Sequence, residues 1–147
     1  MGERGYELAT TATGNRSNAQ LFALAFGVVY LAVGVIGFAI TGFDDFAKES
    51  DKSLLIFDIN PLHNIAHIGV GALLLAGSRS HDAAKSINLM VGIVYALLGV
   101  LGLAGGILVE DLLNNNMADT FLHLATAALA IFFGTAGATA SPRPRTA

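Results

Sequence analysis

The run from Leu21 to Ile40 reads LFALAFGVVYLAVGVIGFAI, and Tyr30 is the only residue in it with a polar side-chain atom. A helix needs about 20 consecutive apolar residues to cross about 30 Å of hydrocarbon. A helix on the surface of a soluble bundle keeps a charged outer face, whereas this run is apolar on every side. Residues 21–40 therefore predict a transmembrane helix.

The charged residues of the 147-residue chain are clustered, and three further charge-free stretches cover residues 59–78, 86–109 and 120–142. Together the four stretches predict transmembrane helices over residues 19–43, 60–77, 86–109 and 117–140. They form one domain, residues 19–140, between an N-terminal arm (1–18) and a C-terminal tail (141–147). Apolar residues make up 54% of the chain, and the mean hydropathy is +0.63. These values exceed those of soluble domains. The predicted fold class is all-α, an integral membrane four-helix bundle.

The composition also excludes several kinds of chemistry. The chain has no cysteine, so it has no thiolate zinc site, iron–sulfur cluster or thiol nucleophile. Its formal charge of −3 gives no basic footprint for nucleic acid. No glycine-rich phosphate loop, Ser/His/Asp grouping or catalytic pair of carboxylates is present, so nothing in the sequence requires an enzyme.

The distribution of Lys and Arg predicts the orientation. Six of the eight fall in the N-terminal arm, the turn at residues 78–85 and the C-terminal tail, namely Arg4, Arg16, Arg79, Lys85, Arg143 and Arg145. Cytoplasmic loops are enriched in Lys and Arg, so we expect a multi-pass protein of the cell membrane with both termini in the cytoplasm. The two remaining loops carry eight of the eleven acidic residues. The outer surface is therefore expected to be acidic.

The chain also contains an internal sequence repeat. At an offset of 65, the first and third predicted helices share six residues: Gly27, Val29, Tyr30, Gly34, Val35 and Gly37 match Gly92, Val94, Tyr95, Gly99, Val100 and Gly102. At an offset of 56, the second and fourth share four: Asn60, His67, Ala72 and Leu73 match Asn116, His123, Ala128 and Leu129. These matches predict two helical hairpins that are parallel repeats about an axis along the membrane normal.

The residues best suited to bind a ligand lie near the starts of the second and fourth predicted helices. His63 and His67 follow Asn60 by three and seven residues, and Asp119 and His123 follow Asn116 at the same spacing. Residues four apart share a helix face, and the repeat brings the two faces to equal depth. Three imidazoles and a carboxylate suit zinc, or iron or manganese with added water. The sequence predicts a metal site of His63, His67, Asp119 and His123 near the extracytoplasmic side.

Two other interpretations of these residues remain open. His67 and His123 are candidate axial ligands of a haem b, with Gly37 and Gly102 leaving room for a porphyrin edge or, equally, for tighter helices. Alternatively, Asp119 and His63 stabilise helix starts, as in a capping box, and the other histidines form hydrogen bonds across the bundle.

The stretch Asn60-Pro61-Leu62-His63-Asn64-Ile65-Ala66-His67 has a later counterpart in Asn116, Asp119 and Leu122-His123-Leu124. Both resemble a domain-of-unknown-function family of small four-span membrane proteins that is common in actinobacteria. The similarity covers roughly residues 17–138. It implies the four-span fold and a membrane location, and it implies no activity, substrate or cofactor.

Three functions follow as hypotheses. The first is a membrane protein that binds a transition metal or haem. The second is a structural accessory subunit of a larger membrane complex, without a cofactor. The third is a small transporter that works as a homo-oligomer, because four short helices enclose little room for a pathway. In each case the main partner is the lipid bilayer.

Overall fold

The computed structural model describes residues 15–105 and 107–139. Most of the predicted N-terminal arm and the predicted tail lie outside these residues. The helices are α1 (Asn18–Thr41), α2 (Pro61–Gly77), α3 (His81–Leu103), α4 (Ile107–Leu113) and α5 (Met117–Gly134), and two short strands, β1 (Ser53–Leu54) and β2 (Phe57–Asp58), precede α2. Among the described residues, α1, α3 and α5 are long and apolar enough to cross a membrane, and α2 is a shorter apolar helix of 17 residues. The chain is an all-α membrane protein.

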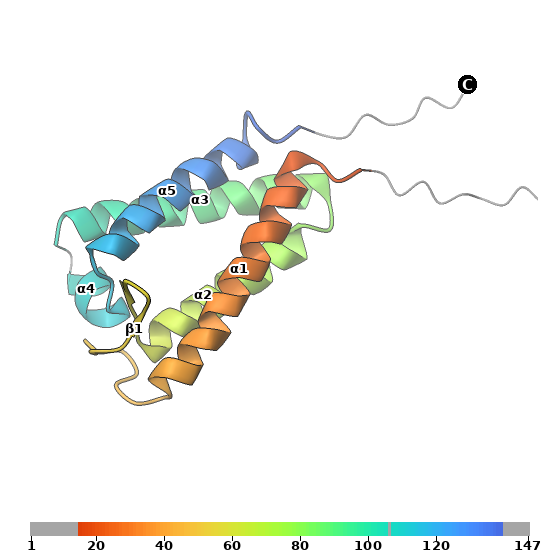
Figure 1. Ribbon diagram of the computed structural model, residues 1–147. Coiled ribbons are helices and arrows are strands. Elements are labelled where there is room, and N and C mark those ends of the chain that lie inside the picture. Colours follow the sequence, from red (N-terminus) through yellow and green to blue (C-terminus); the bar gives the residue numbers. More distant parts are fainter. Residues whose placement is uncertain (1–14, 106, 140–147) are drawn as a thin grey trace, which may run out of the picture.

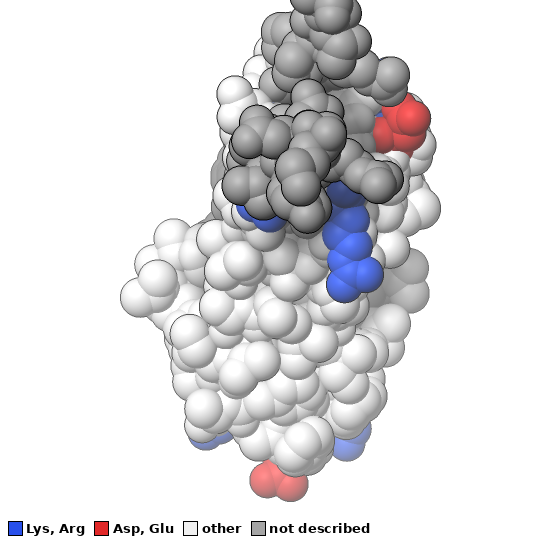
Figure 2. Space-filling view, turned by 90° about the vertical axis from the view of Figure 1, so that its right-hand side faces the viewer, with Lys and Arg blue, Asp and Glu red and all other residues white. Residues whose placement is uncertain are grey.

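The four long helices form two pairs. α1 packs along α2, and α3 packs along α5 (Figure 1). The start of α1, the end of α5 and the turn from α2 to α3 lie together at one end, where the pairs meet. At the other end the pairs diverge, and the antiparallel β1–β2 hairpin and α4 lie there. The face in Figure 2 has a broad band without charged side chains, bounded by charged residues toward both ends, as expected for a bilayer environment.

Glycines set the close approach within each pair, because a Cβ at these positions would collide with the neighbouring helix. A Cβ at Gly34 of α1 would lie 2.7 Å from Ile68 Cγ1 of α2, and one at Gly99 of α3 would collide with Leu124 of α5. Ile68 and Leu124 are 56 residues apart, which is the offset of the sequence repeat. Small residues let helices pack closely in lipid, where no hydrophobic drive brings them together.

Two asparagines join the loops at the open end. The Asn60 amide donates a hydrogen bond to the Leu112 carbonyl at 2.9 Å, and the Asn116 amide donates one to the Ile56 carbonyl at 2.9 Å. Each acceptor lies four residues before the other asparagine. The hydrogen bonds are therefore reciprocal. The cap of each pair's second helix holds the loop that connects the two helices of the other pair.

The helix ends differ from the predicted spans. The third span was expected over residues 86–109, whereas α3 begins at His81 and ends at Leu103. Ser80 caps its start by accepting a hydrogen bond from the Ala83 N–H, so charged residues in the first turn do not stop the helix. Just after α3 the backbone turns at Gly105, where φ is +69°. The last residues of the predicted span, 107–109, belong to α4. The fourth span was expected to reach residue 140, but α5 ends at Gly134.

Candidate functional site

The three histidines of the predicted site lie in one buried cluster with two tyrosines. His63 and His67 come from α2, His123 from α5, Tyr30 from α1 and Tyr95 from α3, and all five side chains are buried. The ring centres of His63 and His67 are 4.5 Å apart, and those of His63 and His123 are 6.5 Å apart. His63 therefore lies close to both of the other imidazoles.

The tyrosines pack on the histidines in a matching way in each helix pair. The ring centres of Tyr30 and His67 are 5.2 Å apart, and those of Tyr95 and His123 are 4.9 Å apart. The two tyrosine rings meet edge to face at 5.5 Å. The Tyr30 hydroxyl donates to Thr126 Oγ1 at 3.2 Å, from one helix pair to the other. Neither the aromatic contacts nor Thr126 emerged from the sequence, because helical spacing within one segment does not show which other helix it faces.

The asparagine caps fix the depth of the site residues. Asn60 Oδ1 accepts a hydrogen bond from the His63 N–H at 2.8 Å, and Asn116 Oδ1 accepts one from the Asp119 N–H at 3.1 Å. Asp119 Oδ2 accepts in return from the Asn116 N–H at 3.3 Å, which completes a capping box. The Asp119 carboxylate thus stabilises the start of α5, as one of the sequence interpretations expected. His63 and Asp119 are both the third residue of their helices.

Three imidazoles line a single cavity of about 120 Å³ together with Tyr95 and apolar side chains. The Nδ1 atoms of His63, His67 and His123 are buried and have no hydrogen-bond partner among the described residues. A buried polar atom left without a partner costs about 1–3 kcal/mol. Cross-bundle hydrogen bonds between described side chains therefore do not account for these three atoms.

The ring separations can be compared with those of a metal site. An imidazole bound through one nitrogen holds its ring centre about 3.2 Å from the ion, since a Zn–N bond is about 2.0–2.1 Å. Two rings on one ion then have centres at most about 6.4 Å apart. The 4.5 Å separation meets this limit and the 6.5 Å separation exceeds it slightly. In residues 15–105 and 107–139, no three His, Cys, Asp or Glu side chains are already arranged to hold a metal. Binding of one ion by all three imidazoles would therefore require the rings to move.

Asp119 does not line the cavity that the three imidazoles share. It lines a second, apolar cavity of about 160 Å³, between α1, α5 and the β1–β2 hairpin, which His67 also lines. The structure thus brings together the three histidines of the predicted site around one cavity. Among them, His67 also lies beside the cavity of Asp119.

The space at the two glycines considered for a porphyrin edge is filled. A Cβ at Gly37 would collide with the Asn64 side chain, and one at Gly102 would collide with Thr120. Asn64 and Thr120 are again 56 residues apart. Both histidine-lined cavities are smaller than the ~300 Å³ at the lower end of pockets for drug-sized ligands. This arrangement favours the tighter-helix alternative at Gly37 and Gly102.

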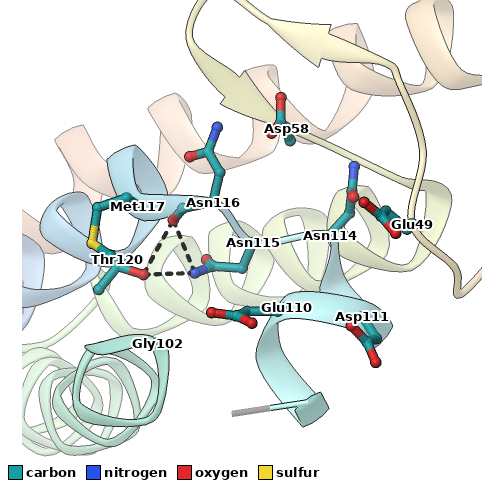
Figure 3. Close-up of a pocket in the computed structure, with 10 residues that line it drawn as sticks. All are labelled: Glu49, Asp58, Gly102, Glu110, Asp111, Asn114, Asn115, Asn116, Met117 and Thr120. Carbon is teal, nitrogen blue, oxygen red and sulfur yellow. Dashed lines mark hydrogen bonds between the residues drawn. The ribbon is translucent and has the colours of Figure 1, made fainter. Parts of the chain in front are cut away.

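An acidic pocket of about 260 Å³ lies at the open end of the molecule (Figure 3). Its charged lining residues are Glu49, Asp58, Glu110 and Asp111. Beside them, the Asn115 amide donates to Thr120 Oγ1 at 2.9 Å, and the Thr120 hydroxyl donates to the Asn116 carbonyl at 3.1 Å. Clefts lined by charge of one sign raise the local concentration of counter-ions. The sequence predicted the acidic surface, but it did not indicate that asparagines complete its floor.

The apolar helices and the buried histidine–tyrosine cluster define an all-α membrane protein with polar groups held inside its helical region. The chain belongs to the family described as a domain of unknown function, DUF4383, whose family profile matches residues 20–136. The resemblance to a family of this kind is therefore confirmed. No curated protein and no solved structure matches the chain.

Proposed function

We propose that this protein is a four-span membrane protein that binds one transition-metal ion through His63, His67 and His123. Zinc, iron and manganese are the candidate ions, because imidazole suits each of them and no thiolate is present. The observation that carries the proposal is that three buried imidazoles line one cavity and that all three Nδ1 atoms lack partners among the described residues. Ionisable groups inside a membrane span are costly, and they commonly mark functional sites.

Four spans follow if α2 crosses the bilayer with the other long helices. Its 17 residues extend about 25 Å, at the short end of the range for a transmembrane helix. α2 is packed against α1 along its length, so it follows the same path through the membrane. The clustering of Lys and Arg favours a cytoplasmic location for both termini. In this orientation the histidines lie near the extracytoplasmic side.

The two helix pairs are, in this proposal, copies of one hairpin. Equivalent glycines contact equivalent residues, equivalent Tyr–His ring pairs have similar separations, and the asparagine hydrogen bonds are reciprocal. His63 departs from this pattern, because Asp119 stands at the equivalent position. The third imidazole is thus supplied by one copy only. A single ion on the internal axis, and not a pair of ions, is the expected stoichiometry.

The proposed ligand set omits Asp119 and haem for physical reasons. The Asp119 carboxylate is engaged in the capping box and lines the other cavity. A porphyrin is much larger than the cavity of about 120 Å³ that the three imidazoles share. One ion fits this cavity.

Metal analysis of protein purified in mild detergent tests the proposal. We expect close to one zinc, iron or manganese ion per chain, or uptake of one Co²⁺ with the visible absorption of a nitrogen-bound ion. His67→Ala and His123→Ala should lose the ion. His81→Ala is the matched control, because His81 lies at the start of α3, at the other end of the molecule, and should retain it.

Other results would contradict the metal site. Wild-type protein that neither contains metal nor takes up added zinc, iron, manganese or cobalt would exclude it. Equal metal content in wild type and in both cluster variants would mean that the ion is bound at another site. A Soret band that is present in the wild type and lost in His67→Ala would identify the ligand as haem and not as a single ion. Metal-free protein that purifies with a larger membrane complex would favour the accessory-subunit hypothesis.

A further inference from the structure

The cavity between α1, α5 and the β1–β2 hairpin shares His67 with the cavity of the proposed metal site but has a different character. Its walls are almost entirely apolar, and they include Phe26 and Val33 of α1 and Leu54 and Phe57 of the hairpin. Its volume is about 160 Å³. Apolar cavities of this size stay dry and take up apolar ligands. Water is therefore a poor occupant.

The cavity opens onto the surface that faces lipid. Three of its lining residues are substantially exposed: Val29 at 55%, Leu122 at 41% and Leu55 at 86%. Val29 and Leu122 lie on helices long and apolar enough to cross the bilayer, so their exposed faces contact hydrocarbon. The apolar mouth is thus continuous with the lipid-facing surface of α1 and α5.

The floor of the cavity is closed to bulk lipid. Tyr30 and Thr126 line it at 5% and 3% exposure, and their hydroxyls are hydrogen-bonded to each other at 3.2 Å. Because these hydroxyls are paired, they do not demand a polar ligand. An empty space beside them would forfeit dispersion contacts that a hydrocarbon chain would supply.

We propose that this cavity is a binding site for one acyl chain of a membrane phospholipid, which enters between Val29 and Leu122 and ends near Tyr30 and Thr126. The hairpin covers the chain through Leu54, Leu55 and Phe57. The lipid fills the space where the two helix pairs diverge, and so it joins the pairs as a structural ligand. This inference does not depend on the metal site, because it rests on a different cavity and on the lipid environment.

Photolabelling in vesicles tests the assignment. The full-length protein is reconstituted into phosphatidylcholine–phosphatidylglycerol vesicles that contain a phospholipid with a diazirine at the end of one acyl chain. After irradiation, mass spectrometry of the peptides locates the label. We expect label on Tyr30 or Thr126, which only a chain inside the cavity can reach. Val29→Trp should fill the mouth and reduce this floor labelling to background.

Val28→Trp is the matched control, because Val28 is the neighbouring valine, is 53% exposed and does not line the cavity. It should keep the floor labelling. Label confined to exposed residues of the wild type overturns the proposal, as does equal floor labelling in wild type and Val29→Trp. If Val29→Trp does not fold, Leu122→Trp replaces it, with Phe121→Trp as its exposed control outside the cavity.

Discussion

Individual glycines determine how closely the helices of each pair approach. Gly71 of α2 faces the backbone of α1: a Cβ there would lie 2.6 Å from the Leu31 nitrogen and 2.9 Å from the Gly27 carbonyl oxygen. Backbone atoms cannot move aside as a flexible side chain can. Gly69, two residues earlier in the same helix, has open space around it. A substitution at Gly71 therefore tests helix packing, whereas the same substitution at Gly69 tests helix propensity alone.

Gly71→Ala should destabilise the protein by about 1–3 kcal/mol, because the added methyl group forces α1 and α2 apart. Gly69→Ala should leave stability unchanged or raise it by up to about 1 kcal/mol, the difference in helix propensity. Thermal unfolding in detergent, followed by circular dichroism, measures both. Equal effects of the two substitutions would mean that α1 and α2 are not packed as closely as described.

The Tyr30–Thr126 hydrogen bond links the two helix pairs directly. Tyr30→Phe and Thr126→Val should each reduce stability, with a coupling of about 0.5–1.5 kcal/mol in a double-mutant cycle. The same unfolding assay applies. Strictly additive effects would show that the hydroxyls do not interact.

At the residue scale, the sequence predicted that His63, His67 and His123 lie close together, and they line one cavity. A repeated spacing of three and seven residues after an asparagine specifies both helix face and depth. The sequence left open whether Asp119 turns to its own helix start or binds a ligand with the histidines. A carboxylate at the third helical position can cap or can bind a ligand, and only the path of the chain before the helix decides between these roles.

Among the structural elements, the two loops at the open end are stabilised by asparagine side chains. Asn60 Nδ2 donates to the Lys48 and Leu112 carbonyls at 3.0 and 2.9 Å, while its Oδ1 caps α2. Asn114 adds a paired contact with Ser50, donating to the carbonyl at 3.0 Å and accepting from the N–H at 3.1 Å. Capping alone requires an acceptor, so the donor side of Asn60 is a distinct function.

Asn60→Ser tests that distinction, because serine retains a capping oxygen and lacks the amide donor. We expect faster hydrogen exchange in residues 44–59 and 107–116, with α2 itself still protected. The loss in stability should be about 1–3 kcal/mol, since the Lys48 and Leu112 carbonyls lose a partner. Asn18→Ser, at an exposed position in α1, is the control and should change neither loop. Unaltered exchange in both loops of Asn60→Ser would contradict the proposed tie.

Helix positions were largely predictable, and helix ends were not. A charge-free stretch marks residues that tolerate hydrocarbon, but a helix continues into water if a cap is present, as Ser80 is for α3. Conversely, an apolar stretch continues past the helix where the backbone turns, as at Gly105. The two-residue strands β1 and β2 are too short to leave an alternating pattern in the sequence.

For the whole molecule, the orientation in the membrane decides which side of the bilayer the proposed site lies near. The chain has no cysteine, so a single introduced cysteine reports accessibility without background. Asp51→Cys, in the loop between α1 and α2, should react with a membrane-impermeant maleimide in intact cells. Asp82→Cys, near the turn between α2 and α3, should react only after the membrane is permeabilised. The reverse pattern would place the histidines near the cytoplasm.

The reciprocal hydrogen bonds from Asn60 and Asn116 bear on how the molecule is completed. Each of these cap carboxamides donates to a carbonyl of the other helix pair, and Asn60 also donates to Lys48 within its own pair. A single hairpin released from the other would lose the cross-pair hydrogen bond, and it would recover that bond by associating with a second hairpin that presents the same carbonyl in return. The polypeptide is thus built like a dimer whose two subunits are joined by the short turn at residues 78–80, and separately expressed halves should reassemble in the membrane.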